Sequence, residues 1–501
     1  MIALAPSAAA PFAESEAVFG GILRRMQSDD TMSMSHGDLE ELLDTEGRKL
    51  LRRLLQDHLD LRANHEPRVE VVDDGGVRNG NVEAGHRRSL QTVFGDVTVT
   101  RRAYRRRGGS NLHPADGILN LPPETFSHGV RKLAAIEAAR GSYEAAAAAI
   151  ERRTGERVGK LQLEQLTARA VIDFDAYNRI ASLQPCGADD VLVISCDGKG
   201  IVMRPDALRE ATRRAASRSE HRLATRLSKG EKANRKRMAE VGAVYDLTPV
   251  VRSAADIMRV SAGDDVVAAP KARAKWLTAS VVEGAATVVA RLFDEAERRD
   301  PQHTRPWVAL VDGNNHQIEL ITAEARRRRV DVTIVVDFVH VLEYLWKAAW
   351  SLHDEGDPAA EDWVREKALS VLEGKASQVA GAMRRSATRR GLDATARRNA
   401  DVCADYLLRK RPYLDYPRAL GSGWPIATGV IEGACRHLVK DRMDITGARW
   451  GLEGAEAVLK LRALAANGSF EEYWGFHVIR EKRRIHESRY LANSVPGDKS
   501  P

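Results

Sequence analysis

The chain has 501 residues, of which 43% are hydrophobic and 29% are charged, with a formal net charge of +7 at pH 7. This length exceeds what one hydrophobic core usually organises, so two to four domains are expected. The four cysteines show no paired spacing and no run of about 18 apolar residues occurs, which excludes a disulfide framework, a zinc knuckle and a membrane span.

The N-terminal part of the chain is expected to be α+β. Residues 1–37 are expected to be weakly structured, and Met1–Phe12 lacks the basic region of a signal peptide. Leucines recur at helical spacing through residues 38–61, which predicts an amphipathic helix or helix pair that packs on its own domain or serves self-association. Alternation through residues 90–104 predicts a hairpin that turns at Gly95-Asp96, within a segment spanning residues 38–127.

Residues 128–185 have the outline of a helix-turn-helix unit. Ser142 is a candidate N-cap for a helix over residues 143–153, and Thr154-Gly155 separates it from a second helix over residues 159–170. In such a unit the second helix would present four side chains to a DNA major groove: Lys160, Gln162, Gln165 and Arg169. A helical hairpin that only packs gives the same pattern, so both interpretations stand.

Two apolar runs end in an aspartate followed by glycine. Val191–Gly200 predicts a buried strand that delivers Asp197 to a sheet edge and stops at Gly198–Gly200, and Trp307–Asn315 repeats this arrangement with Asp312. Ligands of open α/β sheets gather at such carboxyl ends. Further strands are predicted at residues 241–247, 275–282 and 332–336, so the sheet has five strands within residues 190–350.

A basic segment follows Asp197. Residues 204–237 carry twelve Lys or Arg residues against four acids. We expect a helical arm that contacts DNA phosphates beside the sheet edge, whereas a solvated charged face is the alternative. The candidate contacts are Arg213, Arg214, Arg235, Lys236 and Arg237.

The last third of the chain is expected to be mainly helical. Residues 351–423 predict a helical insertion with breaks at three glycines, and residues 424–466 complete the core. Glu432 lies there in a segment with helical apolar spacing, and residues 467–501 form a basic tail. Asp197, Asp312 and Glu432 are together the oxygen ligands that hard divalent cations require, and such a set can hold two metal ions for phosphodiester chemistry.

Four motifs in this order resemble the DDE transposases of bacterial insertion sequences, and the ISKra-type group in particular: Cys-Asp-Gly-Lys-Gly, Val-Asp-Gly-Asn-Asn, Asp-Phe-Val-His-Val-Leu-Glu-Tyr-Leu and Gly-Val-Ile-Glu-Gly. The resemblance runs from about Leu43 to Tyr490. It implies an RNase H-like core preceded by a DNA-binding region, with Asp197, Asp312 and Glu432 as catalytic ligands of two Mg²⁺ ions, for which Mn²⁺ can substitute.

The resemblance also implies partners and a location. The expected partners are double-stranded DNA, at the terminal inverted repeats and the target, and further copies of the chain assembled on the DNA ends, in a bacterial cytoplasm without membrane contact. Two alternatives remain open at this point: a nuclease of the same fold that cuts without joining, and a DNA-binding protein that has lost catalysis.

Both Asp312 and Asp337 end predicted strands, so either can be proposed as the second ligand. In an RNase H-like sheet the fourth strand lies beside the first and the fifth lies one strand further out, with neighbours about 4.8 Å apart. We therefore expect Asp312 to be the ligand. Asp337 and His340 match an Asp-x-x-His signature of related transposases, which implies a supporting role.

Overall fold

The computed structural model describes residues 10–217, 231, 234–258, 267–354, 356–445 and 447–498. The chain forms two compact units: Met1–Ile180 with Ser469–Pro501, and Ala181–Gly468. The C-terminal segment, predicted as a basic tail, is therefore part of the first unit. No helix in the described ranges is long and apolar enough to cross a membrane.

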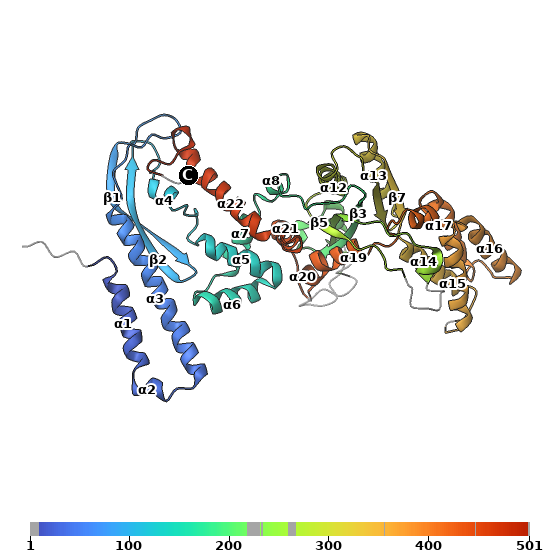
Figure 1. Ribbon diagram of the computed structural model, residues 1–501, viewed down its shortest axis with the longest axis horizontal. Coiled ribbons are helices and arrows are strands. Elements are labelled where there is room, and N and C mark those ends of the chain that lie inside the picture. The colour runs from blue at the N-terminus through green and yellow to red at the C-terminus, as the bar shows by residue number, and fades with distance from the viewer. Residues whose placement is uncertain are drawn as a thin grey trace, which may run out of the picture. The chain divides into compact units, whose positions relative to one another are not determined.

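The first unit begins with a helical hairpin (Figure 1), formed by α1 (Ala13–Met26), α2 (Asp29–Met32) and α3 (His36–Asn64). The prediction of a weakly structured segment up to residue 37 is wrong for α1 and α2. Asp57 of α3 holds α1 in place, because its buried carboxylate accepts hydrogen bonds from the backbone N–H and the hydroxyl of Ser15. The predicted helix over residues 38–61 is confirmed as one continuous helix, which Ser35 and Asp38 cap reciprocally.

A β-hairpin packs on α3. It consists of β1 (Asn81–Thr92) and β2 (Gly95–Arg105), which are antiparallel. Thr92 pairs with Gly95, so the chain turns at Val93-Phe94, two residues before the predicted turn. Gly95 has φ +115°, a conformation that other residues rarely adopt, and so it begins β2. The small core here consists of Leu59, Leu90, Val97, Val99 and Leu121.

The remaining helices of the first unit are α4 (Pro114–Ile118), α5 (His128–Arg140), α6 (Tyr143–Thr154), α7 (Lys160–Arg169), α8 (Phe174–Asn178) and α22 (Phe470–Ile485). Ser142 caps α6 as predicted, because its hydroxyl accepts a hydrogen bond from Ala145 N at 3.1 Å. Two ion pairs hold α22 in place: the buried Arg131 of α5 binds Glu481 at 2.9 Å, and the buried Asp173 binds the more exposed Arg484 at 3.0 Å.

The second unit contains a mixed five-stranded sheet, made of β3 (Val191–Val202), β4 (Lys236–Leu247), β5 (Arg273–Ser280), β6 (Trp307–Val311) and β7 (Val332–Val336). The strand order is β5-β4-β3-β6-β7; β3, β6 and β7 are parallel, and the other pairs are antiparallel. The prediction that the fourth strand of this sheet lies beside the first and the fifth lies outside it is confirmed. Residues 191–196 are buried, as the continuous apolar run predicts.

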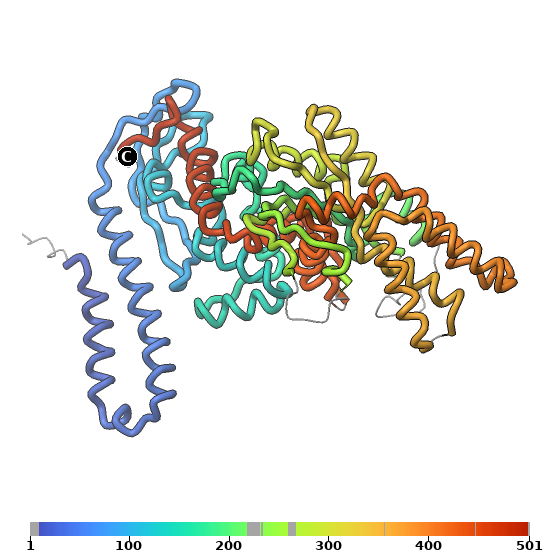
Figure 2. The backbone as a smooth tube through the Cα atoms, turned by 45° about the vertical axis from the view of Figure 1, so that its right-hand side comes forward, coloured from blue at the N-terminus to red at the C-terminus, as the bar shows by residue number. Residues whose placement is uncertain are grey.

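Between and after these strands the chain forms helices (Figure 2): α12 (Ala285–Arg299), α13 (Asn315–Arg328), α14 (Phe338–Ala349) and α21 (Leu452–Ala466). Between α14 and Glu432 lie α15 (Pro358–Leu372), α16 (Ala376–Arg389), α17 (Arg398–Lys410) and α18 (Tyr416–Gly421). The predicted breaks have a conformational basis, because Gly356, Gly374 and Gly391 have φ values of +86°, +82° and +64°. The chain then forms α19 (Gly429–Ala434), the π-helical turn η3 (Cys435–Lys440) and α20 (Asp441–Met443).

Candidate metal-binding and catalytic site

Asp197 and Asp312 occupy equivalent positions on neighbouring parallel strands. The last paired residues of β3 and β6 are Ser195 and Leu310, and each aspartate lies two residues further on. The Ser195 hydroxyl donates a hydrogen bond to the Leu310 carbonyl at 2.6 Å, which fixes this register. Equivalent positions on adjacent parallel strands lie side by side about 4.8 Å apart and point to the same face. The register therefore brings the two half-buried carboxylates to one level of the sheet.

The prediction that β3 stops at Gly198–Gly200 is wrong. The strand continues to Val202, and Gly198 and Gly200 pair with Glu240 and Met238 of β4. Gly198 therefore lies within a paired strand rather than in a turn. Asp197 thus lies inside β3, at the level where the shorter neighbour β6 ends.

The Asp312 loop contacts the helical insertion. Asp312 Oδ1 accepts a hydrogen bond from Asn314 N at 2.8 Å, and Gly313 has φ +93°. The Tyr406 hydroxyl of α17 donates to the Asp312 carbonyl at 3.4 Å. A Cβ atom at Gly313 would lie 2.8 Å from that hydroxyl oxygen. The insertion therefore holds the loop that carries Asp312, and only glycine fits at residue 313.

Asp337, His340 and Glu432 form a compact group whose potential ligand atoms lie within 4.8 Å of one another. Asp337 is fully buried and caps α14, because it accepts a hydrogen bond from Val339 N at 2.8 Å. Its Oδ2 lies 3.2 Å from His340 Nδ1 and within hydrogen-bonding distance of the Thr428 hydroxyl. That hydroxyl also lies 3.2 Å from Glu432 Oε1. The residues predicted as auxiliary are thus linked to the predicted catalytic glutamate.

Cysteine thiols contact the Asp197 side of the site. Cys435, the first residue of η3, donates a hydrogen bond from Sγ to Asp197 Oδ2 at 3.3 Å. Burial, together with the negative charge of Asp197, raises the pKa of the Cys435 thiol well above its usual range. Burial, with the charges of Asp312, Glu240 and Asp197, raises the pKa of Cys196 to about 12. Both thiols therefore stay protonated at neutral pH, and Cys435 remains a hydrogen-bond donor.

The same electrostatic couplings place the acids in one neighbourhood. The negative charges of Asp197 and Asp312 raise the pKa of Cys196, and those of Asp197 and Glu432 raise the pKa of Cys435. Burial raises the pKa of Tyr406, which also senses Asp312 and Asp337. Among the described residues, only Asp337, His340 and Glu432 bring three potential ligand atoms within 4.8 Å of one another. The strand register, rather than direct contact, links Asp197 and Asp312 to this group.

Two further residues of the site were not predicted. Thr428 directly precedes the Gly-Val-Ile-Glu-Gly motif, and a hydroxyl one helical turn before Glu432 was a readable signal. Glu240 pairs with Gly198 across β3 and β4. Burial, then the charge of Asp197, raises the pKa of Glu240. In the sequence Glu240 directly precedes the predicted strand at residues 241–247.

The predicted DNA-binding residues of α7 all lie on the exposed side of that helix: Lys160, Gln162, Gln165 and Arg169. Gly155, with φ +74°, ends α6 before the turn. Lys160 binds Glu144 at 2.5 Å and Arg169 binds Glu124 at 2.7 Å, whereas apolar residues on the other side of α7 are buried. The helix thus has a packed face and an exposed face that is polar apart from Leu161.

The predicted basic arm divides into three parts. Residues 218–230 and 232–233 lie outside the described residues. Arg213 and Arg214 are exposed on α9 (Glu210–Ser217), where both bind Glu210, and Lys236 is exposed on β4. Arg235 and Arg237 need correction, because Arg235 is buried and the Arg237 guanidinium donates to the carbonyls of Val281 and Ala207. Their donors serve the fold rather than a phosphate.

No protein-family model matches the sequence, and no curated protein matches it either.

Proposed function

We propose that this protein is a metal-dependent DNA strand transferase of the transposase type, with an RNase H-like catalytic core. The observation that carries the proposal is the alignment of Asp197 and Asp312 on adjacent parallel strands. Glu432 is on α19, which packs against β3 and β4. Two neighbouring strands and one helix thus carry the three carboxylates of the proposed site.

The topology of the second unit supports the proposal. Three antiparallel strands followed by two parallel ones, in the order β5-β4-β3-β6-β7, is the arrangement expected for an RNase H-like sheet. Four helices intervene between α14 and the glutamate helix, at the place where related transposases have a helical insertion. The sequence motifs that resemble DDE transposases all fall on this edge of the sheet or next to it.

The donor set suits a hard divalent cation. Carboxylate oxygens are the ligands that Mg²⁺ and Mn²⁺ prefer. Asp197, Asp312 and Glu432 would hold the ions. When bound, two such ions would activate the attacking water or 3′-hydroxyl and stabilise the leaving oxygen of the phosphodiester.

The other residues of the site orient these ligands. Cys435 donates a hydrogen bond to Asp197, and Gly198 N donates to Asp197 Oδ1 at 2.6 Å. The Thr428 hydroxyl lies within hydrogen-bonding distance of both Asp337 and Glu432 and donates its single proton to one of them, so Asp337 and His340 would position the glutamate through this hydroxyl. Such outer partners fix the direction of a ligand and tune its affinity for the metal.

The proposed substrate is double-stranded DNA at the terminal inverted repeats of a mobile element, joined to a target. The exposed polar face of α7 would read the repeat from the major groove, and the exposed arginines of α9 would contact phosphates. Copies of the chain would assemble on paired ends. Recognition of the repeat by α7 would then depend on the first unit, whereas the phosphate contacts of α9 and the chemistry would depend on the second unit.

The test uses duplexes taken from the DNA that flanks the coding region. With Mg²⁺, the full-length protein should cleave them and join the ends to a target, while Asp197→Asn and Glu432→Gln should bind in a mobility-shift assay without cleaving. Asp331→Asn is the matched control, because this exposed residue precedes β7 at its opposite end. Cleavage by Asp197→Asn would refute the proposal, and cleavage without joining would establish the nuclease alternative.

A further inference from the structure

We propose that α3 pairs with α3 of a second copy in antiparallel orientation, which makes the protein a dimer without DNA. The contact would be the leucine face, defined as Leu43, Gly47, Leu50, Leu51 and Leu54. Leu43 and Leu51 are each 45% exposed, and Leu54 is 38% exposed. The opposite side of α3 packs on β2, and Leu55 and Leu59 enter the core there.

The spacing of these residues suits a helix partner. Leu43, Gly47, Leu50 and Leu54 are separated by four, three and four residues, which is the a/d repeat of a coiled coil. The stripe belongs to a helix of 29 residues, long enough for a continuous seam. No atom lies within 4 Å of a Cβ placed on Gly47. The seam is therefore open at its centre, where glycine lets two backbones approach closely.

Charge determines the partner and its direction. Residues 38–46 carry five acids and no base, and residues 48–53 carry four bases and no acid. Gly47 separates the halves. An antiparallel partner places the acidic half of one helix opposite the basic half of the other, whereas a parallel partner opposes like charges. The same helix therefore complements itself, as a two-fold symmetric contact requires.

Arg53 is held within its own copy by Glu14 and the buried Asp57, but the ion pairs that join the two halves of α3 can be exchanged. Arg48 binds Asp44, and Lys49 binds Glu46 at 3.0 Å. Each pair joins the acidic half of α3 to its basic half. In each pair one of the two side chains is largely exposed, so each ion pair contributes little to stability. Exchange of these partners for the equivalent charges of a second copy costs little, while the leucine face is removed from water.

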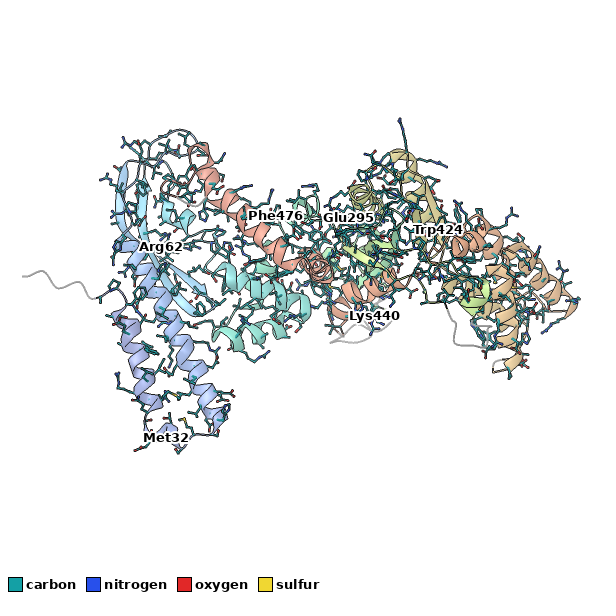
Figure 3. All side chains as sticks on the ribbon, viewed as in Figure 1. Met32, Arg62, Glu295, Trp424, Lys440 and Phe476 are labelled. Carbon is teal, nitrogen blue, oxygen red and sulfur yellow. The ribbon has the colours of Figure 1, made fainter. Side chains whose placement is uncertain are left out.

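The leucine face of α3 lies on the side of the helical hairpin that points away from the β-hairpin. Met32, 79% exposed, lies at the tip of the turn between α1 and α3, and Arg62 lies at the end of α3 that packs on the β-hairpin (Figure 3). Phe19 and Leu23, one turn apart on α1, are 50% and 47% exposed. Both α1 and α3 of the helical hairpin therefore carry exposed apolar side chains.

Sedimentation velocity of the full-length protein without DNA tests the dimer. The wild type should be dimeric at micromolar concentration, and Leu43→Gln/Leu51→Gln/Leu54→Gln should raise the dissociation constant by about 100-fold or more. Val402→Gln on α17 replaces a comparably exposed apolar residue and should leave the dimer unchanged. A monomeric wild type at tens of micromolar, or an unchanged dimer in the triple variant, would overturn the proposal.

Disulfide trapping tests the direction, without relying on a variant that weakens the helix. In a Cys186→Ser background, Leu43→Cys protein mixed with Leu51→Cys protein should cross-link on oxidation, and neither should cross-link alone. In the antiparallel dimer, two copies of residue 43 differ in height by about 12 Å, beyond the reach of a disulfide. Cross-linking of Leu43→Cys with itself would overturn the antiparallel arrangement. Neither result depends on the proposed catalytic function.

Discussion

Cys435 and Asp197 are joined by a hydrogen bond of 3.3 Å from Sγ to Oδ2, although 238 residues separate them in the chain. The contact links the π-helical turn after the glutamate helix to the centre of β3. Irregular helical turns of this kind are frequent at functional sites. Here the turn brings a protonated thiol to a proposed metal ligand.

We predict that Cys435→Ala weakens metal-dependent cleavage while Cys435→Ser restores it. Loss of the donor should raise the Mg²⁺ concentration at half-maximal cleavage by about tenfold, because outer hydrogen bonds orient metal ligands. A Mg²⁺ titration of cleavage provides the measurement. Cys403→Ala, which removes another buried thiol, is the control. An equal effect of Cys403→Ala would indicate loss of packing rather than of the hydrogen bond.

Asp312→Asn and Asp337→Asn should behave differently. Asp312→Asn should eliminate Mg²⁺-dependent cleavage with little change in stability, because the half-buried carboxylate bonds to Asn314 N of its own loop and an amide oxygen can replace it there. Asp337→Asn should leave measurable cleavage but reduce the free energy of unfolding by about 1–3 kcal/mol, since one of two buried acceptor oxygens becomes an amide donor. Cleavage assays and urea unfolding distinguish the two. Abolished cleavage in Asp337→Asn alone would make Asp337 the second ligand.

Asp173→Asn should destabilise the first unit. Burial opposes ionisation of Asp173, but hydrogen bonds from His477 and Arg484 outweigh it and hold its pKa well below the ordinary value. We expect the free energy of unfolding to fall by about 3–5 kcal/mol at pH 7, because the groups around Asp173 are left without their charged partner. Since the folded-state pKa is lowered, this stabilisation is present above about pH 4 and disappears as the pH falls further.

Urea unfolding at pH 7 and at pH 3 measures this difference, with Trp474 of α22 as a fluorescent reporter. The difference in free energy of unfolding between wild type and Asp173→Asn should be smaller at pH 3 than at pH 7. Glu151→Gln, an exposed change on α6, should have no effect at either pH. If this difference in free energy of unfolding were the same at both pH values, the charge of Asp173 would not be the stabilising feature.

Arg213→Gln/Arg214→Gln should flatten the salt dependence of DNA binding. Removal of one phosphate contact lowers the slope of log affinity against log salt by about 0.9. Both arginines are exposed on α9, and Glu210 alone binds them in the described chain. Arg365→Gln, which removes an exposed arginine from α15, should leave the slope unchanged. An unaltered slope in the double variant would identify α9 as a solvated surface.

Local features of the sequence determined the elements of this protein. The buried run before Asp197 specified a strand covered on both faces, and Ser142 specified the start of α6, because burial pattern and capping act over a few residues. The positions of Gly356, Gly374 and Gly391 specified helix breaks for the same reason. The sheet order also followed once the resemblance supplied a topology.

Only the tertiary structure decided how these elements meet. The level shared by Asp197 and Asp312 depends on the register between β3 and β6, and β3 continues past Asp197 because β4 pairs with its glycines. Thr428 reaches Asp337 across 91 residues, and α22 returns to the first unit through Asp173. Such contacts depend on hydrogen-bond partners distant in the chain, which local periodicity does not encode. For the same reason, α1 could not be predicted from its own residues, because Asp57 of α3 supplies the buried partner of Ser15.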